Sequence, residues 1–147
     1  MELIKLQIKL INFINDIDKK YKIKFAYLFG SRARGDNTDN SDIDIAIFFK
    51  DEYDSLQEIL IRGNIIEDGK AYLGIPVDVI SLKSAPLILK HQIIKDGIIL
   101  KDDDDRPSFE SLTFREYFDF KYYSDIYDAA IINSIKAGEY FRRWANG

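Results

Sequence analysis

The sequence predicts an α/β domain, of the α+β kind, with a small mixed β-sheet, flanking helices and a long C-terminal helix. Short apolar runs of strand length alternate with amphipathic stretches of helical spacing over the first 105 residues. From Phe109 to Trp144 the pattern is helical. A chain of 147 residues is also long enough to bury a core without disulfides.

The first helix and the first two strands are predicted from periodicity. Over residues 2–18, apolar side chains recur every three or four positions with lysines on the other side, as in a helix packed on a core. Residues 23–29 are almost continuously apolar, which predicts a central strand. Along residues 42–49 the apolar side chains alternate with Asp42 and Asp44, so both carboxylates point to the same face.

The middle of the chain predicts a helix, a turn and a third strand. Asp54 is suited to cap a helix, with a glutamine three residues later at the capping-box position. We expect this helix to break near Gly63, because glycine is unfavourable inside a helix, and expect a turn at residues 68–70. Residues 76–80 form a short strand that opens with a proline, where no ladder donor is lost.

The last elements are a short helix, a brief strand and the C-terminal helix. Ser84 is predicted to cap a helix that ends near Asp96, followed by a strand at 98–100 and a solvated turn of four aspartates. We expect two units: residues 1–105 as the main domain, and 106–147 as a helical extension belonging to the same compact unit or to a partner interface. One apolar stripe of that extension comprises Tyr123, Tyr127, Ala130, Ser134, Ala137, Phe141 and Trp144. With further isoleucines on its other sides, the helix carries more apolar surface than docking on one small domain requires.

Composition and charge exclude several classes of function. Without cysteine the chain has neither disulfides nor a thiolate metal site. No apolar run approaches the ~20 residues of a membrane span, and the N-terminus lacks the pattern of a signal peptide, so we expect a cytoplasmic protein. The net charge is −4, with no basic stripe for a long nucleic acid, whereas a single nucleoside triphosphate needs only a few local cations.

The candidate site lies where the first strand ends. Gly30 and Ser31 follow that strand at once and expose backbone N–H groups to an anion. Asp42 and Asp44 then offer two carboxylates on one face, which suits a divalent cation carrying phosphates. Asp78 stands between two valines in a strand expected to be buried, where a carboxylate is costly unless it is paired or binds a metal.

These residues resemble a known signature. Gly30-Ser31, ten intervening residues and Asp42-Ile43-Asp44 resemble the nucleotidyltransferase superfamily that includes DNA polymerase beta, and Asp78 stands where that family places its third carboxylate. The compact form, Gly-Ser-Arg-Ala-Arg-Gly followed by Ser-Asp-Ile-Asp, is similar to the minimal nucleotidyltransferases (MNT). These are commonly encoded as the antitoxin of HEPN–MNT toxin–antitoxin pairs. The resemblance covers residues 23–80 and implies a polymerase beta-like nucleotidyltransferase domain over 1–105.

The resemblance implies roles for six residues. Gly30 and Ser31 would hold the triphosphate of ATP. Arg34, more than its neighbour Arg32, stands where related enzymes place a phosphate-contacting arginine. The catalytic carboxylates would be Asp42, Asp44 and Asp78. All three would bind Mg²⁺, expected as two ions, and Asp78 would also accept the proton of the attacking hydroxyl.

The implied activity is transfer of AMP from ATP to a hydroxyl, expected to be a tyrosine, of a HEPN ribonuclease toxin. Two alternatives remain: adenylylation of a small molecule such as an aminoglycoside, and a non-catalytic toxin-binding module. A homo- or hetero-oligomer is compatible with either role. A HEPN nuclease is disfavoured, because those toxins resemble all-helical bundles with an arginine four to six residues before a histidine. The single histidine, His91, has no such arginine and is expected to be a surface or packing residue.

Overall fold

The computed structural model describes residues 2–138 and confirms the mixed α/β prediction. Four strands form one sheet in the order β3-β2-β1-β4, in which β1 is antiparallel to β2 and β4, and β2 is parallel to β3. The elements in chain order are α1 (Leu3–Tyr21), β1 (Ile23–Phe29), α2 (Ser31–Arg34), β2 (Ile43–Phe49), α3 (Ser55–Leu73), β3 (Val77–Ser81), α4 (Leu87–Asp96), β4 (Ile98–Lys101) and α5 (Arg106–Lys136).

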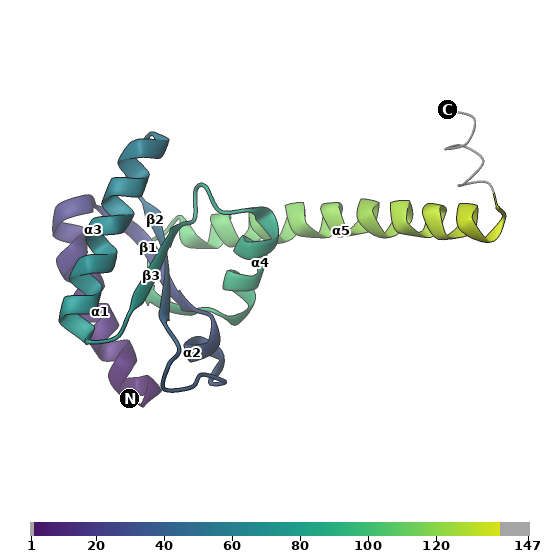
Figure 1. The fold of residues 1–147 in the computed structure, drawn as a ribbon. Helices are drawn as coiled ribbons and strands as arrows, with labels where there is room; N and C mark the ends of the chain where they lie inside the picture. Colours follow the sequence, from purple (N-terminus) through teal and green to yellow (C-terminus); the bar gives the residue numbers. More distant parts are fainter. Residues whose placement is uncertain (1, 139–147) are drawn as a thin grey trace.

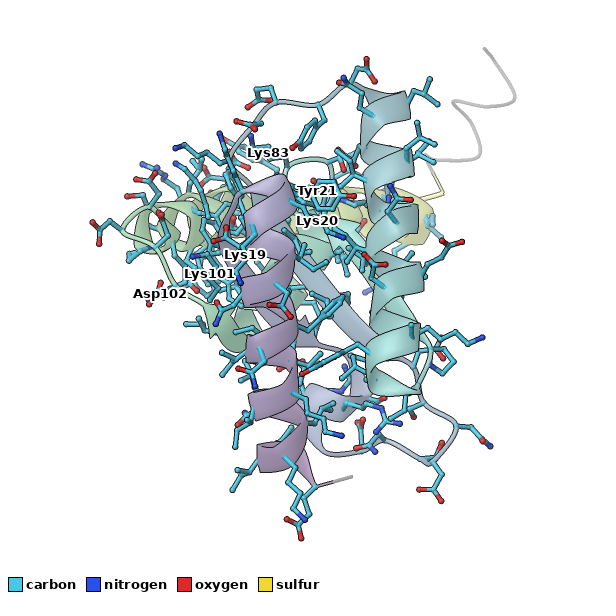
Figure 2. The ribbon with its side chains drawn as sticks, turned by 90° about the vertical axis from the view of Figure 1, so that its left-hand side faces the viewer. Lys19, Lys20, Tyr21, Lys83, Lys101 and Asp102 are labelled. Atoms are coloured by element: carbon cyan, nitrogen blue, oxygen red, sulfur yellow. The ribbon has the colours of Figure 1, made fainter. Side chains whose placement is uncertain are left out.

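Helices cover both faces of the sheet (Figure 1). On one face α1 and α3 lie side by side (Figure 2), and they enclose a core built on Ile43, Ile45 and Ile47 of β2. On the other face α4 and the start of α5 pack on a second core that contains Ala46 and Phe48. The alternation along β2 therefore divides its side chains between two cores, and β1 is central, as predicted.

Helix α3 departs from the prediction, because it runs unbroken through both of its internal glycines. Its N-terminus has the predicted capping box of Asp54 and Gln57. Gly69 lies inside the helix and is buried, since a Cβ there would approach the Val77 side chain to 3.0 Å and Phe13 to 3.3 Å. The glycine that suggested a turn instead lets α3 pack closely on β3 and α1. Gly63 faces open space and is tolerated at a modest helical cost.

The start of α4 also differs from the prediction. The helix begins at Leu87, after Pro86, and Ser84 is not its cap. The Ser84 hydroxyl instead donates to the Glu58 carboxylate at 2.5 Å, across to α3. A cap residue must lie directly before the first turn, and Ser84 is occupied by the turn that leaves β3.

A polar network anchors the start of α5 to the sheet. The buried Tyr27 hydroxyl donates to Glu110 at 2.7 Å, and Arg106 contacts both Glu110 (3.0 Å) and Asp102 (2.6 Å). Burial of Tyr27, followed by its hydrogen bond to Glu110, raises the pKa of the phenol well above its usual value. Part of the aspartate run expected to be merely solvated therefore fixes the first turn of the helix.

Helix α5 then leaves the domain and projects away from it (Figure 1). An aromatic cluster joins α5 to α4: the His91 ring stacks on Tyr117 with a centroid distance of 3.5 Å and also meets Phe114 and Phe118 edge-on. His91 is thus a packing residue, as predicted. Phe141 and Trp144 of the predicted stripe lie outside the described residues. Among the helices in residues 2–138, none combines the length and apolar character needed to cross a membrane.

Candidate functional site

Strand pairing brings the predicted site residues to one end of the sheet. Asp44, at the start of β2, pairs with Phe29 at the end of β1, so it lies beside Gly30. In the parallel pairing of β2 with β3, Asp44 stands opposite Asp78. The prediction that carboxylates from two strands meet next to the Gly-Ser turn is consistent with this register.

Gly30 and Asp44 are in direct contact. The backbone of Gly30 has φ 75° and ψ −159°, a conformation that essentially only glycine adopts. A Cβ built at this position would lie 2.2 Å from Oδ2 of Asp44. The absent side chain of Gly30 therefore makes room for the Asp44 carboxylate, and both steric space and backbone conformation require glycine here.

The charges around Asp44 define the rest of the cluster. Partial burial, followed by the negative charges of Asp78 and Asp42, raises the pKa of the Asp44 carboxyl above its usual value. The positive charge of Arg34 acts in the opposite direction. Two further carboxylates and one guanidinium thus act electrostatically on Asp44 at this end of the sheet.

The two arginines of α2 have different surroundings. Arg32 is 5% exposed and directs Nε and Nη2 at the carbonyl oxygen of Ser41, at 3.0 and 2.8 Å. It therefore fixes the loop that leads into Asp42. Arg34 is more exposed and donates to Asp36 at 3.2 Å, a surface pair that is weak in water. Of the two, only Arg34 has a side chain free to move toward an incoming phosphate.

Two of the carboxylates are more exposed than the sequence suggested. Asp78 was expected in a buried strand, but β3 is an edge strand with one unpaired edge, and Asp78 is exposed. The inference that this carboxylate needs a partner because it is buried is therefore wrong. Asp42 was expected inside the second strand, yet it lies just before Ile43, where β2 begins, and is also exposed.

The donor set suits a hard divalent cation. Carboxylate oxygens are the ligands that Mg²⁺ prefers, and a cation would relieve the repulsion that, after burial, raises the pKa of Asp44. Within residues 2–138, no three acidic or histidine side chains stand close enough together to enclose an ion as they are. Exposed Asp42 and Asp78 can change rotamer at little cost, so the cluster is compatible with closing around a cation.

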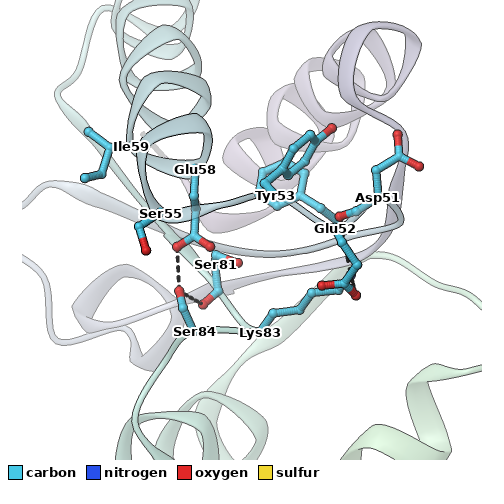
Figure 3. A pocket seen from close by; sticks show the side chains of 10 residues that line it. Asp51, Glu52, Tyr53, Ser55, Glu58, Ile59, Ser81, Lys83 and Ser84 are labelled. Atoms are coloured by element: carbon cyan, nitrogen blue, oxygen red, sulfur yellow. Dashed lines mark hydrogen bonds and ion pairs between the residues drawn. The ribbon is translucent and has the colours of Figure 1, made fainter.

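A separate hollow of about 390 Å³ lies at the opposite end of β2, between the start of α3 and the chain after β3 (Figure 3). Its wall includes the Lys83–Glu52 ion pair at 2.8 Å and the Ser84–Glu58 hydrogen bond. Phe49, which lines it, is six residues along β2 from Ile43, roughly 20 Å at the rise of a strand. This hollow is therefore distinct from the carboxylate cluster, and no motif in the sequence predicts it.

Comparison with protein families and curated proteins agrees with this geometry. The profile of the family described as "Polymerase beta, Nucleotidyltransferase" matches residues 10–106. The chain is 47% identical over 66 residues to a candidate protein adenylyltransferase of Methanocaldococcus jannaschii, covering 44% of this chain and 63% of that protein. It is 34% identical over 76 residues to the protein adenylyltransferase MntA of Shewanella oneidensis, covering 52% of each. The matches thus span between half and two thirds of these relatives.

Solved structures extend the similarity beyond the matched sequence. A chain of a toxin–antitoxin complex crystallised with AMP-PNP has a TM-score of 0.67 and 28% identity, over 86% of this chain and 98% of that one. A chain from the complex of tri-AMPylated Shewanella oneidensis HEPN toxin with MNT antitoxin has a TM-score of 0.63 and 26% identity, over 88% and 98%. A chain described as a minimal nucleotidyltransferase has a TM-score of 0.51 and 22% identity, over 67% and 95%, and shows the fold alone.

The family match covers well over half of the chain, including the Gly30 turn, Asp42, Asp44 and Asp78. The sheet order, the contact of Gly30 with Asp44 and the similarity of structure agree with it. The chain belongs to the polymerase beta nucleotidyltransferase family.

Proposed function

We propose that this chain transfers AMP from ATP, with Mg²⁺, to a tyrosine hydroxyl of a cognate HEPN-type ribonuclease toxin and thereby acts as its antitoxin. The observation that carries the proposal is the contact between Gly30 and the Asp44 carboxylate, with the charges of Asp78 and Asp42 acting on that carboxylate. A purely structural role does not explain why carboxylates that repel one another are placed together.

Each residue of the site has its own role in the transfer of AMP. The toxin hydroxyl oxygen forms a bond to the α-phosphorus of ATP, the bond to the departing pyrophosphate breaks, and Asp78 takes the hydroxyl proton. Asp42, Asp44 and Asp78 would hold Mg²⁺, which supplies charge neutralisation on the phosphate oxygens. The backbone at Gly30 and Ser31 binds and orients the triphosphate, and Arg34 leaves its surface pair with Asp36 to contact a phosphate.

The choice of donor and acceptor rests on the comparisons. One similar structure contains AMP-PNP, a nucleotide analogue, and another contains a HEPN toxin that carries AMP groups. Curated relatives bear the name protein adenylyltransferase. These descriptions apply to those proteins, and together with the family match they favour ATP as donor and a toxin side chain as acceptor for this chain.

The test combines labelled ATP, Mg²⁺ and the purified product of the neighbouring gene. We expect label on that protein, loss of label when Mg²⁺ is chelated, and loss of label when its candidate acceptor tyrosine is replaced by phenylalanine. A variant with Asp42→Asn and Asp44→Asn should keep the fold and transfer nothing, because its amides cannot replace the carboxylates. Asp16→Asn, at an exposed carboxylate on α1, is a control outside the cluster.

The same experiment separates the alternatives. Label on an aminoglycoside and none on the protein would replace the proposal by small-molecule adenylylation. Neutralisation of the toxin by the Asp42→Asn, Asp44→Asn variant, undiminished relative to the wild type, would replace it by a binding module that needs no chemistry.

A further inference from the structure

The projecting half of α5 exposes a dense set of large apolar side chains. From Phe118 onward, eight of them are between 45% and 70% exposed. They are Phe118, Phe120, Tyr122, Tyr123, Ile126, Tyr127, Ile132 and Ile135. We call these eight residues the α5 apolar surface. Isolated helices are marginal in water, and a helix with this surface gains stability chiefly when a partner covers it.

The α5 apolar surface lies on more than one side of the helix rather than on one stripe. Phe118, Tyr122 and Ile126 follow one another at intervals of four residues and therefore share one side. Tyr123 and Tyr127 are also four residues apart, but they are about 100° further round the helix than Tyr122 and Ile126. A single flat surface can cover only one of these sides, whereas a groove between two helices covers both.

The area is that of a stable interface. Taking ~200 Å² for a fully exposed large side chain, the eight exposed fractions amount to on the order of 900 Å² of side-chain surface. A standard protein–protein interface buries ~800 Å² on each partner, and the largest apolar patch of a monomer is commonly ~300–600 Å². The α5 apolar surface is therefore large enough to hold a partner by itself.

The comparisons indicate which partner. The 86% of this chain that matches the AMP-PNP toxin–antitoxin structure is about 126 residues, so at least about twenty matched residues lie beyond residue 105. The match to the chain described as a minimal nucleotidyltransferase covers 95% of that chain but only 67% of this one. That share is about 98 residues, which is no longer than the part of this chain before α5. Relatives solved with a toxin thus share part of α5.

We propose that the α5 apolar surface docks into a groove between two helices of the HEPN-type toxin, so that α5 holds the toxin while the carboxylate cluster modifies it. This inference rests on the proposed function for the identity of the partner. The side with Tyr122 and Ile126 and the side with Tyr123 and Tyr127 would each contact one of the two toxin helices.

Two matched pairs of substitutions test the docking. Tyr122→Gln with Ile126→Gln alters one side of α5, and Tyr123→Gln with Tyr127→Gln alters the other; glutamine keeps helix propensity. The control is Leu56→Gln with Leu60→Gln on α3, where the two leucines are 66% and 59% exposed. The measurement is calorimetric affinity for the purified neighbouring gene product, with circular dichroism confirming the fold.

We expect each α5 pair to weaken binding by about 30-fold or more, as for interface hot spots, and the α3 pair to leave it unchanged. Unchanged affinity in both α5 pairs would overturn the docking site. Loss in one pair alone would overturn the two-helix groove. Self-association that the α5 pairs abolish, without any effect on toxin affinity, would assign the surface to a second copy of this chain and overturn the proposal.

These variants test toxin binding and AMP transfer independently of each other. The Asp42→Asn, Asp44→Asn variant should bind the toxin like the wild type and transfer no AMP. A wild type that binds through α5 and transfers nothing would contradict the proposed function and leave the docking intact. Transfer by both α5 pairs at wild-type rate and affinity would contradict the docking and leave the proposed function intact.

Discussion

Replacing Gly30 by alanine tests the contact on which the site depends. The new methyl carbon would stand 2.2 Å from Oδ2 of Asp44, and an ordinary contact needs ~3.4 Å, so the carboxylate must retreat by roughly 1 Å. A displacement of that size in a group that positions the reacting atoms costs ~100-fold in rate. The positive φ adds a stability cost of about 2 kcal/mol.

Gly35→Ala provides the matched control. Gly35 also has a positive φ, of 82°, but a Cβ there meets no atom within 4 Å. We expect this variant to lose about 1 kcal/mol of unfolding free energy and to keep its transfer rate. The assay is the initial rate of AMP transfer at saturating ATP, with unfolding in urea measured alongside.

We expect Gly30→Ala to lose transfer rate to an extent that its loss of stability does not explain. If Gly30→Ala retains transfer within a few-fold of the wild type, the contact with Asp44 does not position a catalytic carboxylate. Equal losses of rate in Gly30→Ala and Gly35→Ala would likewise refute the argument, because backbone strain in the loop would then account for both.

Further outcomes follow from packing and charge, each measured as unfolding free energy. Gly69→Ala should destabilise by about 1–3 kcal/mol, since its Cβ crowds a packed side chain, whereas Gly63→Ala on the open face should stabilise by about 1 kcal/mol. Asp44→Asn should stabilise by about 1 kcal/mol at pH 7. The pKa of Asp44 is raised in the folded state. The gain in stability from Asp44→Asn should therefore be absent at pH values below the pKa of the unfolded state, and it should grow as the pH rises through the pKa of the folded state. Tyr27→Phe should cost about 1 kcal/mol by removing the donor to Glu110. Three results would contradict the stated causes. They are an unchanged free energy of unfolding in Tyr27→Phe, an increased one in Gly69→Ala, and a stability gain in Asp44→Asn that shrinks as the pH rises.

Periodicity predicted the sheet because each strand has an unambiguous pattern. The first strand, residues 23–29, has the predicted bounds, since a continuous apolar run next to a glycine leaves one way to bury it. The alternation of β2 predicted which side chains enter which core. The strand pairing of Asp44 with Asp78 is consistent with the family resemblance, whereas periodicity within each strand carries no information about register between strands.

The predictions that the structure contradicts were wrong for a common reason, since each depends on tertiary contacts. Gly69 carries the signal of a turn, but its contact with Val77 makes a small residue necessary inside a helix. Asp78 between two valines suggests burial, but whether a strand is central or at the edge depends on sheet order, which the local sequence does not encode. The sequence does not predict the role of Arg32, because its acceptor, the Ser41 carbonyl, is a backbone group that any residue provides.

The central claim is that the carboxylates beside Gly30 transfer AMP to a toxin. The most direct measurement is the intact mass of the neighbouring gene product after incubation with ATP, Mg²⁺ and this chain. We expect mass increases of whole AMP units with the wild type and none with the Asp42→Asn, Asp44→Asn variant. An unchanged mass with the wild type, or equal increases with both proteins, would contradict it.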